Sequence, residues 1–322
     1  MVGCHKPTSR LSIAEAKSRY KVKKSAVRRT STVYIPPVDF KQGIPRTDEY
    51  LALLPTSFFK EIEHHSNQFV QNLTSKNLKE LDQWDWPVDP LHTWSRQWEY
   101  PFCISHLKQW QSGLSMPENR YKLADLGAGL SFLPKYLHDM SWEVICCDAD
   151  TRPHIIYQRI GLGKCCRWDF LNLPSLSYEN NMFDAILCIS VLEHLAMEEI
   201  LVVLSEVFRV LKPGGLFILT FDIRLDSKTG NSLNIGYTHR ILEYLGKTFA
   251  QDLSKVQRDV NALSSFHNTG LFLTTDWIRQ EYPKLLPWKL SMRGVIKQIS
   301  RLHWPSRPFE SLGVCCLALE RP

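Results

Sequence analysis

The sequence predicts an α/β protein built on a mostly parallel sheet, and three observations support this prediction. Short continuous apolar segments alternate with helical patterns from residue 121 onward, as expected of strands that helices cover on both faces. A turn with two glycines, Gly127 and Gly129, directly follows the first apolar segment. Acidic residues stand where the first three segments end. Open sheets of this class bind ligands outside the carboxyl ends of their strands, which is where the turn and the acids fall.

The elements expected around this turn are short and regularly spaced. Apolar segments predict strands over residues 121–126, 143–148, 164–170, 183–189 and 216–223. Helical spacing of apolar residues predicts helices over residues 132–140, 152–161 and 197–211. The sequence Pro213-Gly214-Gly215 is expected to end the last of these helices. A further helix is expected near residues 276–282 and a last strand over residues 312–319.

The positive charge of the chain is concentrated at its N-terminus. Residues 1–46 carry eleven Lys and Arg but only Glu15 and Asp39 as acids, a balance of +9, so the remaining residues carry −3. Residues 1–45 are therefore expected to form a disordered basic arm. The mildly acidic body argues against a nucleic-acid partner. A weak tether to nucleic acid or membrane is the alternative role for the arm.

Two further regions flank the expected core, residues 116–322. Residues 46–115 predict a helical cap, in which aromatic residues are dense. Its tryptophans are Trp84, Trp86, Trp94, Trp98 and Trp110. These side chains are expected to pack the cap, or also to line an apolar ligand pocket. Residues 224–285, after the fifth strand, predict a helical insertion.

Composition also bounds the cellular setting. No apolar segment reaches 18 residues, so no membrane span is expected, and the N-terminus lacks the apolar segment of a secretory signal. Six of the nine cysteines form three adjacent pairs within apolar segments. Neighbours on a strand point to opposite faces, so these cysteines are expected to be buried thiols in a reducing, cytoplasmic environment.

The turn after the first strand favours S-adenosylmethionine (SAM) over a dinucleotide. A dinucleotide site needs a third glycine three residues after the second, and the bulky Phe132 stands there. Asp125, just before the first glycine, would repel a pyrophosphate but suits the amino end of SAM. Asp148, which ends the second strand, can accept both ribose hydroxyls. Asp169, at the end of the third strand, can accept the adenine amine while Phe170 packs on the base.

The chain resembles the class I SAM-dependent methyltransferases, in the branch that includes the ubiquinone- and menaquinone-type enzymes. The resemblance is carried by KLADLGAGLSFLPKYL (122–137), EVICCDAD (143–150), RWDFLNLP (167–174), FDAILCISVLEHL (183–195) and EVFRVLKPGGLFILTFDI (206–223). It implies a Rossmann-like, seven-stranded sheet with an antiparallel last strand. It also implies the ligand contacts: Asp125, Gly127 and Gly129 for methionine, Asp148 for ribose, Asp169 and Phe170 for adenine, and Ile189 and Ser190 for the methyl group.

Three further site expectations concern the helix before the core and the segment after the fourth strand. The helix before the core closes over SAM in relatives, so Arg96 or Tyr100 is expected to reach its carboxylate, with cap packing as the alternative. Some relatives bind a metal through an acid at the position of Ser190 together with the following Glu-His. Serine removes that ligand, so Glu193 and His194 alone are not expected to hold a metal. His194 is the expected general base where one is needed, ahead of His267, His239 and Tyr237.

The expected reaction is methyl transfer from SAM to a small, fairly apolar acceptor. The aromatic cap and the mildly acidic body support this acceptor class. Two alternatives stay open: an RNA or protein methyltransferase that uses the basic arm, and a SAM-binding protein without catalysis. The sequence leaves the methylated atom and the oligomeric state open.

Overall fold

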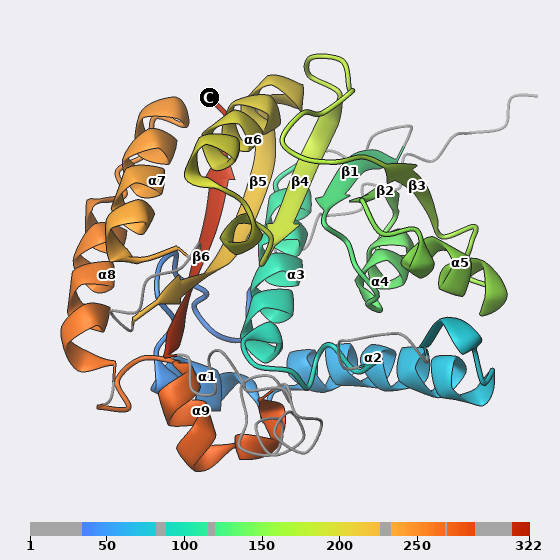
Figure 1. Ribbon diagram of the computed structural model, residues 1–322, viewed down its shortest axis with the longest axis horizontal. Coiled ribbons are helices and arrows are strands. Elements are labelled where there is room, and N and C mark those ends of the chain that lie inside the picture. Colours follow the sequence, from blue (N-terminus) through green and yellow to red (C-terminus); the bar gives the residue numbers. More distant parts are fainter. Residues whose placement is uncertain (1–33, 82–87, 115–119, 226–232, 268, 287–310) are drawn as a thin grey trace, which may run out of the picture. The chain divides into compact units, whose positions relative to one another are not determined.

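A computed structural model describes residues 34–81, 88–114, 120–225, 233–267, 269–286 and 311–322. Its sheet has six strands in the order β3-β2-β1-β4-β5-β6 (Figure 1). In chain order these are β1 (Tyr121–Leu126), β2 (Trp142–Asp148), β3 (Cys166–Phe170), β4 (Phe183–Ile189), β5 (Leu211–Arg224) and β6 (Leu312–Glu320). The first five strands pair in parallel, and β6 pairs antiparallel with β5. The mostly parallel sheet with an antiparallel last strand is confirmed.

The expected count of seven strands is not met in the described part of the chain, which contains six. Between β5 and β6 the described residues form helices α7 (Ile235–Thr248), α8 (Ser254–Phe266) and α9 (Thr275–Glu281) and the short helix η3 (Pro283–Leu285). The antiparallel strand β6 therefore lies directly beside β5. The helices in this region agree with the predicted helical insertion after β5.

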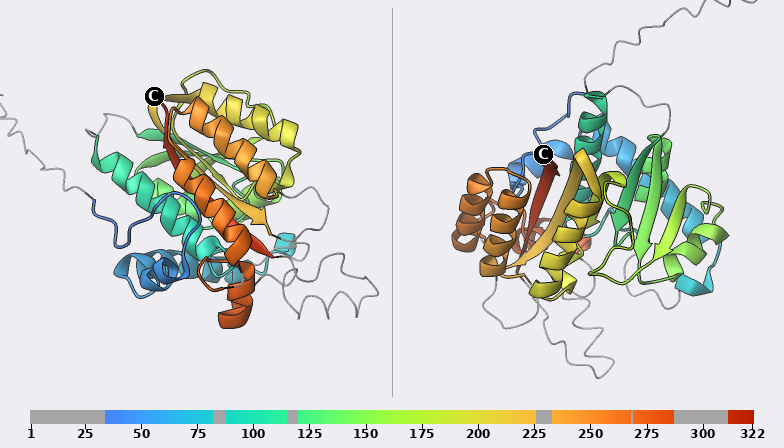
Figure 2. Two further views of the ribbon diagram at one scale, coloured as in Figure 1. Left: turned by 90° about the vertical axis from the view of Figure 1, so that its left-hand side faces the viewer. Right: turned by 90° about the horizontal axis from the view of Figure 1, so that it is seen from above.

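Helices cover both faces of the sheet. The first face carries Leu123, Val144 and Cys146, which share a core with α3 (Arg96–Ser112), α4 (Leu133–Asp139) and α5 (Arg152–Arg159). The second face carries Ala124 and Ile145, which share a core with α6 (Met197–Val210), α7 and α8. Figures 1 and 2 show α7 and α8 side by side in this second layer. The apolar strands thus bury side chains on both faces, as their sequence predicts.

Adjacent cysteines divide between the two faces. Cys146 and Cys316 belong to the first core, and Cys147 and Cys315 to the second. All four are buried thiols without a disulfide. Within the described residues, no three His, Cys, Asp or Glu side chains gather in a way that could hold a metal ion.

The N-terminal boundary of the folded part lies earlier than residue 45. The backbone of Gly43 exchanges two hydrogen bonds with Cys316 of β6, at 2.8 and 2.9 Å. Phe40 is buried against Trp98, with ring centroids 5.1 Å apart. Residues 34–45 are therefore part of the fold and not of an arm, because two apolar side chains, Phe40 and Ile44, enter the core. Residues 1–33 of the expected arm lie outside the described residues.

The predicted cap consists of α1 (Thr47–Leu53), α2 (Ser57–Ser75), the short helix η1 (Lys79–Leu81) and α3. Tyr50 of α1 packs edge-on against Trp277 of α9, at a centroid distance of 5.8 Å, and the two helices are neighbours in Figure 1. Helix α3 is more than a cap, because it forms part of the layer on the first face. Trp98 is 1% exposed and packs in the core, whereas Trp84 and Trp86 lie outside the described residues.

The transition from α6 to β5 differs from the expectation. The helix ends at Val210, and β5 begins at the next residue, before Pro213-Gly214-Gly215. Gly214 has φ +72, and the pairing of β4 with β5 shifts between Phe183 and Ala185. The glycines therefore allow an irregularity within the strand pair instead of ending the helix.

Among the helices of the described residues, none has both the length and the apolar character of a membrane span.

Candidate functional site

The turn after β1 brings the backbone to the carboxyl edge of the sheet without side chains. Gly127 has φ +68 and Gly129 has φ +54, in the left-handed region that favours glycine. A Cβ on Gly127 would lie 2.5 Å from Cγ2 of Val191, in the segment after β4. The N–H of Gly127 donates to the carbonyl of Cys147 at 2.7 Å. The turn is therefore packed tightly between the ends of β2 and β4.

Asp148 ties the end of β2 to this turn. Its Oδ2 accepts a hydrogen bond of 2.8 Å from the N–H of Gly129, and its Oδ1 accepts one of 2.9 Å from the N–H of Asp150. Each carboxylate oxygen has a second acceptor site. The geometry fits a carboxylate that is held by the backbone and still able to accept from a vicinal diol.

Asp125 is a buried acid that favours a cationic ligand. Asp125 is only 3% exposed to solvent. Burial, together with the negative charge of Asp148, raises the pKa of Asp125 to about 7, although Arg96 opposes the shift. Ionised Asp125 is thus poorly compensated by the protein itself. An ammonium group beside it would supply the missing charge.

Asp169 lies at the same edge but has different neighbours. Side chains alternate between the two faces along a strand. Asp125 and Asp148 each follow a second-face residue and so lie on the first face, whereas Asp169 follows the first-face residue Trp168 and lies on the second face. Its carboxylate accepts from Tyr178 Oη at 2.8 Å and from Arg167 Nη2 at 2.7 Å. Phe170 is 50% exposed, and its ring lies 5.4 Å from that of His154. An exposed ring at this position leaves a face open for a base.

The first turn of α3 adds a polar network that includes a residue missed by the sequence argument. Glu99 is fully buried, and its carboxylate accepts from Ser95 Oγ at 2.7 Å, Ser190 Oγ at 2.9 Å, Thr220 Oγ1 and the guanidinium of Arg96. Arg96 also donates to Ser190 Oγ at 2.6 Å. Burial opposes ionisation of Glu99, but Arg96 and the hydroxyl donors outweigh it and lower the pKa of Glu99. A glutamate in an aromatic segment gave no sequence signal for this role.

Two of the predicted contact residues on α3 and β4 lie close to the same network. The ring of Tyr100 packs edge-on against Phe132 at 5.4 Å. Burial raises the pKa of Tyr100 to about 12, with Arg96 opposing the shift and Glu99 and Asp125 adding to it. Ile189 is the last residue of β4 and pairs in register with Thr220. The cap helix therefore brings Arg96 and Tyr100 to the edge where Asp125 lies.

The segment after β4 forms the short helix η2 (Leu192–His194) and carries two acid–base candidates. His194 is exposed, whereas the Oε2 atom of Glu193 is buried without a hydrogen-bond partner in the structure. Burial, together with the charge of Asp222 on β5, raises the pKa of Glu193 well above its usual value. Asp222 accepts from Trp94 Nε1 at 2.9 Å. From the sequence, His194 is the expected base, and Glu193 is considered as a metal ligand but not as a base.

The other predicted base candidates lie on the opposite layer. Tyr237 and His239 belong to α7, and His267 follows α8. His239 Nε2 lies 2.8 Å from Asn261 Oδ1. Both helices cover the second face, whereas Asp125 and Asp148 lie on the first. The fold does not gather these three residues with the acids.

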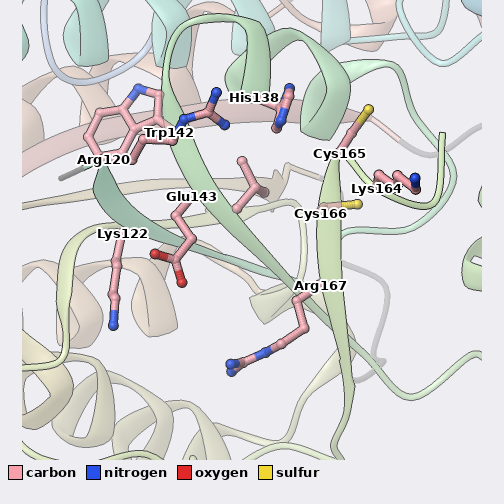
Figure 3. Close-up of a pocket in the computed structure, with 10 residues that line it drawn as sticks. Arg120, Lys122, His138, Trp142, Glu143, Lys164, Cys165, Cys166 and Arg167 are labelled. Carbon is pink, nitrogen blue, oxygen red and sulfur yellow. The ribbon is translucent and has the colours of Figure 1, made fainter. Parts of the chain in front are cut away.

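A depression at the other edge of the sheet is distinct from this site. It has a volume of about 550 Å³ and is lined by residues at the amino ends of β1, β2 and β3, among them Lys122, Glu143 and Arg167 (Figure 3). The glycine turn and Asp148 lie at the carboxyl ends of the same strands. Ligands of open α/β sheets bind at the carboxyl ends, so the depression is not the candidate donor site.

Comparisons with known proteins agree with this geometry. The family model described as a methyltransferase domain matches residues 124–219. Sterol 24-C-methyltransferase of Aspergillus fumigatus is 26% identical over 159 residues, 47% of this chain and 40% of that protein. A sterol 24-C-methyltransferase of Gibberella zeae is 26% identical over 131 residues, 41% of this chain and 32% of that protein. The chain thus spans less than half the length of these relatives.

Solved structures of methyltransferases also align with the chain over part of its length. Phosphoethanolamine N-methyltransferase 2 of Haemonchus contortus is 12% identical, with 68% of this chain and 52% of that chain covered and a TM-score of 0.38. An S-adenosylmethionine-dependent methyltransferase of Mesorhizobium loti is 19% identical, with 36% and 52% covered and a TM-score of 0.31.

The methyltransferase-domain match begins within β1 and ends within β5. It therefore contains the glycine turn, Asp148 and the segment after β4. A buried acid that needs a cation, a turn without side chains and a carboxylate placed for a diol suit the amino acid and ribose parts of SAM. Residues 124–219 thus match a methyltransferase domain, and the geometry at the carboxyl ends of its strands suits SAM as the methyl donor.

Proposed function

We propose that this protein transfers the methyl group of SAM to a small, fairly apolar acceptor. The proposal rests mainly on two acids beside the glycine turn: Asp125, which is buried, and Asp148, which accepts a hydrogen bond from the backbone of the turn. Asp125 would hold the ammonium of the donor, Asp148 its ribose hydroxyls, and Arg96 or Tyr100 its carboxylate. Asp169 and Phe170 would contact adenine, and Ile189 and Ser190 would face the methyl group.

SAM, when bound, supplies a methyl group already activated by its sulfonium. The chain therefore has to align the acceptor and exclude water. An amine acceptor needs only its neutral lone pair, whereas a hydroxyl or an acidic carbon must lose a proton. His194 is the proposed base for such acceptors. Glu193 is the second candidate, because its Oε2 atom is buried in the segment after β4 without a hydrogen-bond partner in the structure.

The acceptor class rests on two lines of support. Aromatic residues surround the first turn of α3, with Trp94 and Tyr100 both buried there. The relatives that match part of the chain are named sterol 24-C-methyltransferases, and a sterol is a small, largely apolar molecule. The branch of ubiquinone- and menaquinone-type enzymes fits the same acceptor class.

The test is a methyl-transfer assay with labelled SAM and a panel of acceptors. The panel contains sterols, small amines, phenols and carboxylic acids, together with tRNA and a protein extract. We expect transfer to at least one small apolar compound. Transfer only to tRNA or protein would refute the acceptor class, and binding of S-adenosylhomocysteine (SAH) without any transfer would indicate a non-catalytic SAM-binding protein.

A further inference from the structure

Glu99 is the common partner of residues from three elements. It stands in the first turn of α3, and its side chain is 0% exposed. It accepts from Ser95 and Arg96 at the start of α3, from Ser190 after β4, and from Thr220 within β5. One carboxylate therefore joins the cap helix to two neighbouring strands at the carboxyl edge.

Stability alone does not account for this arrangement. Moving a carboxylate and a guanidinium out of water has a large desolvation cost, and a buried ion pair is often no more stable than well-packed apolar side chains of similar size. Glu99 and Arg96 are both held in fixed geometry by hydroxyl groups. Such a network restricts the conformations available to its members. The network therefore fixes the orientation of Ser190 and Arg96.

The turn after β4 is the element that most needs this restraint. Ser190 has φ +51, a left-handed conformation that a non-glycine residue adopts only when its surroundings impose it. Its N–H donates to the carbonyl of Thr220 at 2.9 Å, and its hydroxyl donates to Glu99. The same Oε1 atom of Glu99 accepts from Thr220. Backbone and side-chain bonds thus fix Ser190 against β5 from two directions.

We propose that Glu99 is a positioning residue, which holds the turn after β4 and the guanidinium of Arg96 in the geometry that receives the methyl donor. The inference rests on the proposed function, because Ser190 and Arg96 are the residues proposed to contact SAM. Glu99 acts through these two residues. Its own carboxylate is surrounded by protein donors.

Hydrogen–deuterium exchange tests the proposal without any ligand. We expect Glu99→Gln to raise amide exchange in residues 186–195, because the substitution removes the charge that holds Arg96 and weakens the hydrogen bonds from Ser190 and Thr220. Exchange in α2 is expected to stay unchanged. Glu61→Gln is the matched control: Glu61 also joins the cap to the core, through Tyr136 Oη at 2.7 Å and Lys108 Nζ of α3 at 3.5 Å. Its replacement is expected to affect α2, α4 and the part of α3 around Lys108, and not residues 186–195.

SAH titration provides the second readout, at a temperature where circular dichroism shows each variant fully folded. We expect Glu99→Gln to weaken SAH binding about tenfold and Thr220→Val to weaken it about threefold, since small displacements of contact groups have effects of this order. Glu61→Gln should stay within about twofold of the unaltered protein.

The outcomes separate this inference from the proposed function. If the unaltered protein binds no SAH, the proposed function fails. If it binds SAH, and Glu99→Gln changes neither the exchange of residues 186–195 nor the affinity, Glu99 is only a packing residue and the inference is overturned. If Glu99→Gln does not fold, Thr220→Val, which removes one donor to Glu99, decides between the same two results.

Discussion

The carboxylate of Asp148 accepts a hydrogen bond of 2.8 Å from the backbone N–H of Gly129, so the end of β2 holds the turn that follows β1. This bond links two features that the sequence shows as separate motifs. It forms because β1 and β2 are neighbours in register, with Leu126 opposite Cys147. Asp148 therefore shapes the turn, and the remaining acceptor sites of its carboxylate are those proposed for the ribose.

Replacement of Asp148 should weaken SAH binding strongly. In the proposed site, Asp148→Ala would remove two charge-assisted hydrogen bonds to the ribose diol, together about 3 kcal/mol, so we expect an affinity loss of about 100-fold. Isothermal titration measures the change. Asp150→Ala is the control, because Asp150 pairs through its side chain with Arg152 while only its backbone contacts Asp148. Equal losses in the two variants would contradict the role given to Asp148.

The glycine turn should be sensitive to a single methyl group. In Gly127→Ala the new Cβ meets Cγ2 of Val191 at 2.5 Å, in addition to the cost of φ +68. We expect a loss of about 2–4 kcal/mol in the free energy of unfolding, measured with urea. In Gly161→Ala, at φ +81 with nothing within 4 Å of the added Cβ, only the backbone cost of about 1 kcal/mol should remain.

A second substitution can separate the two costs at Gly127. Val191→Ala removes the atoms that the new Cβ would meet. Gly127→Ala should therefore cost less stability when it is added to Val191→Ala than when it is made in the unaltered protein. The close packing of the turn on the segment after β4 is disproved if the two substitutions prove additive.

SAH affinity should rise with pH up to about 7. The pKa of Asp125 is raised to about 7 in the free protein, mainly by burial. Between the ordinary pKa of about 3.8 and this raised value, ionisation of Asp125 increasingly opposes folding, and the ammonium of SAH relieves that cost. Binding below pH 7 therefore releases a proton, and affinity should increase by up to about tenfold per pH unit.

Calorimetry between pH 5.5 and 8.5 measures this dependence. Asp125→Asn should bind SAH weakly at every pH and lose the slope, whereas Asp150→Asn should keep it. A flat profile for the unaltered protein would show that Asp125 does not meet the cation.

The segment before α3 should lose stability as the pH rises. His92 Nδ1 lies 2.7 Å from Asp89 and Nε2 lies 3.1 Å from Glu63 of α2. The hydrogen bond to Asp89 raises the pKa of His92, burial opposes the rise, and Glu63 adds to it. The contribution of protonated His92 is therefore complete below the unfolded value of about 6.5 and is lost as the pH passes through the higher folded value.

Melting temperatures between pH 5.5 and 8.5 check this sign. The deficit of His92→Gln relative to the unaltered protein should be largest at pH 5.5 and should shrink toward pH 8.5. His64→Gln, which removes an exposed histidine beside Gln68, should show no such trend. A deficit that grows with pH would exclude the two ion pairs as its cause.

The acid–base residue after β4 can be identified once an acceptor is known. If a base is needed, His194→Ala should lower kcat about 100-fold or more without changing SAH affinity. Glu193→Gln should leave kcat within about threefold in that case. The reverse pattern would assign the proton to Glu193, and unchanged kcat in both would indicate an acceptor, such as a neutral amine, that needs no base.

Much of the sheet could be predicted because the apolar residues of its buried strands are visible in the sequence. The predicted bounds of β1 and β4, at 121–126 and 183–189, match the structure, since both strands are mostly apolar segments between polar turns. The start of β5 could not be predicted. Pro213 and the following glycines are typical helix-ending residues, and only pairing with β4 shows that they lie inside a strand.

The sequence by itself determined the α/β class, the glycine turn and the acids at the strand ends, because strand periodicity and local backbone needs are properties of short segments. Only the tertiary structure decided which side chains meet. It paired Gly43 with Cys316 of β6, put Asp169 on the opposite face from Asp125, and brought Glu99 to Ser190 and Thr220, 91 and 121 residues away along the chain. Such contacts depend on strand order and helix packing, which no local pattern encodes.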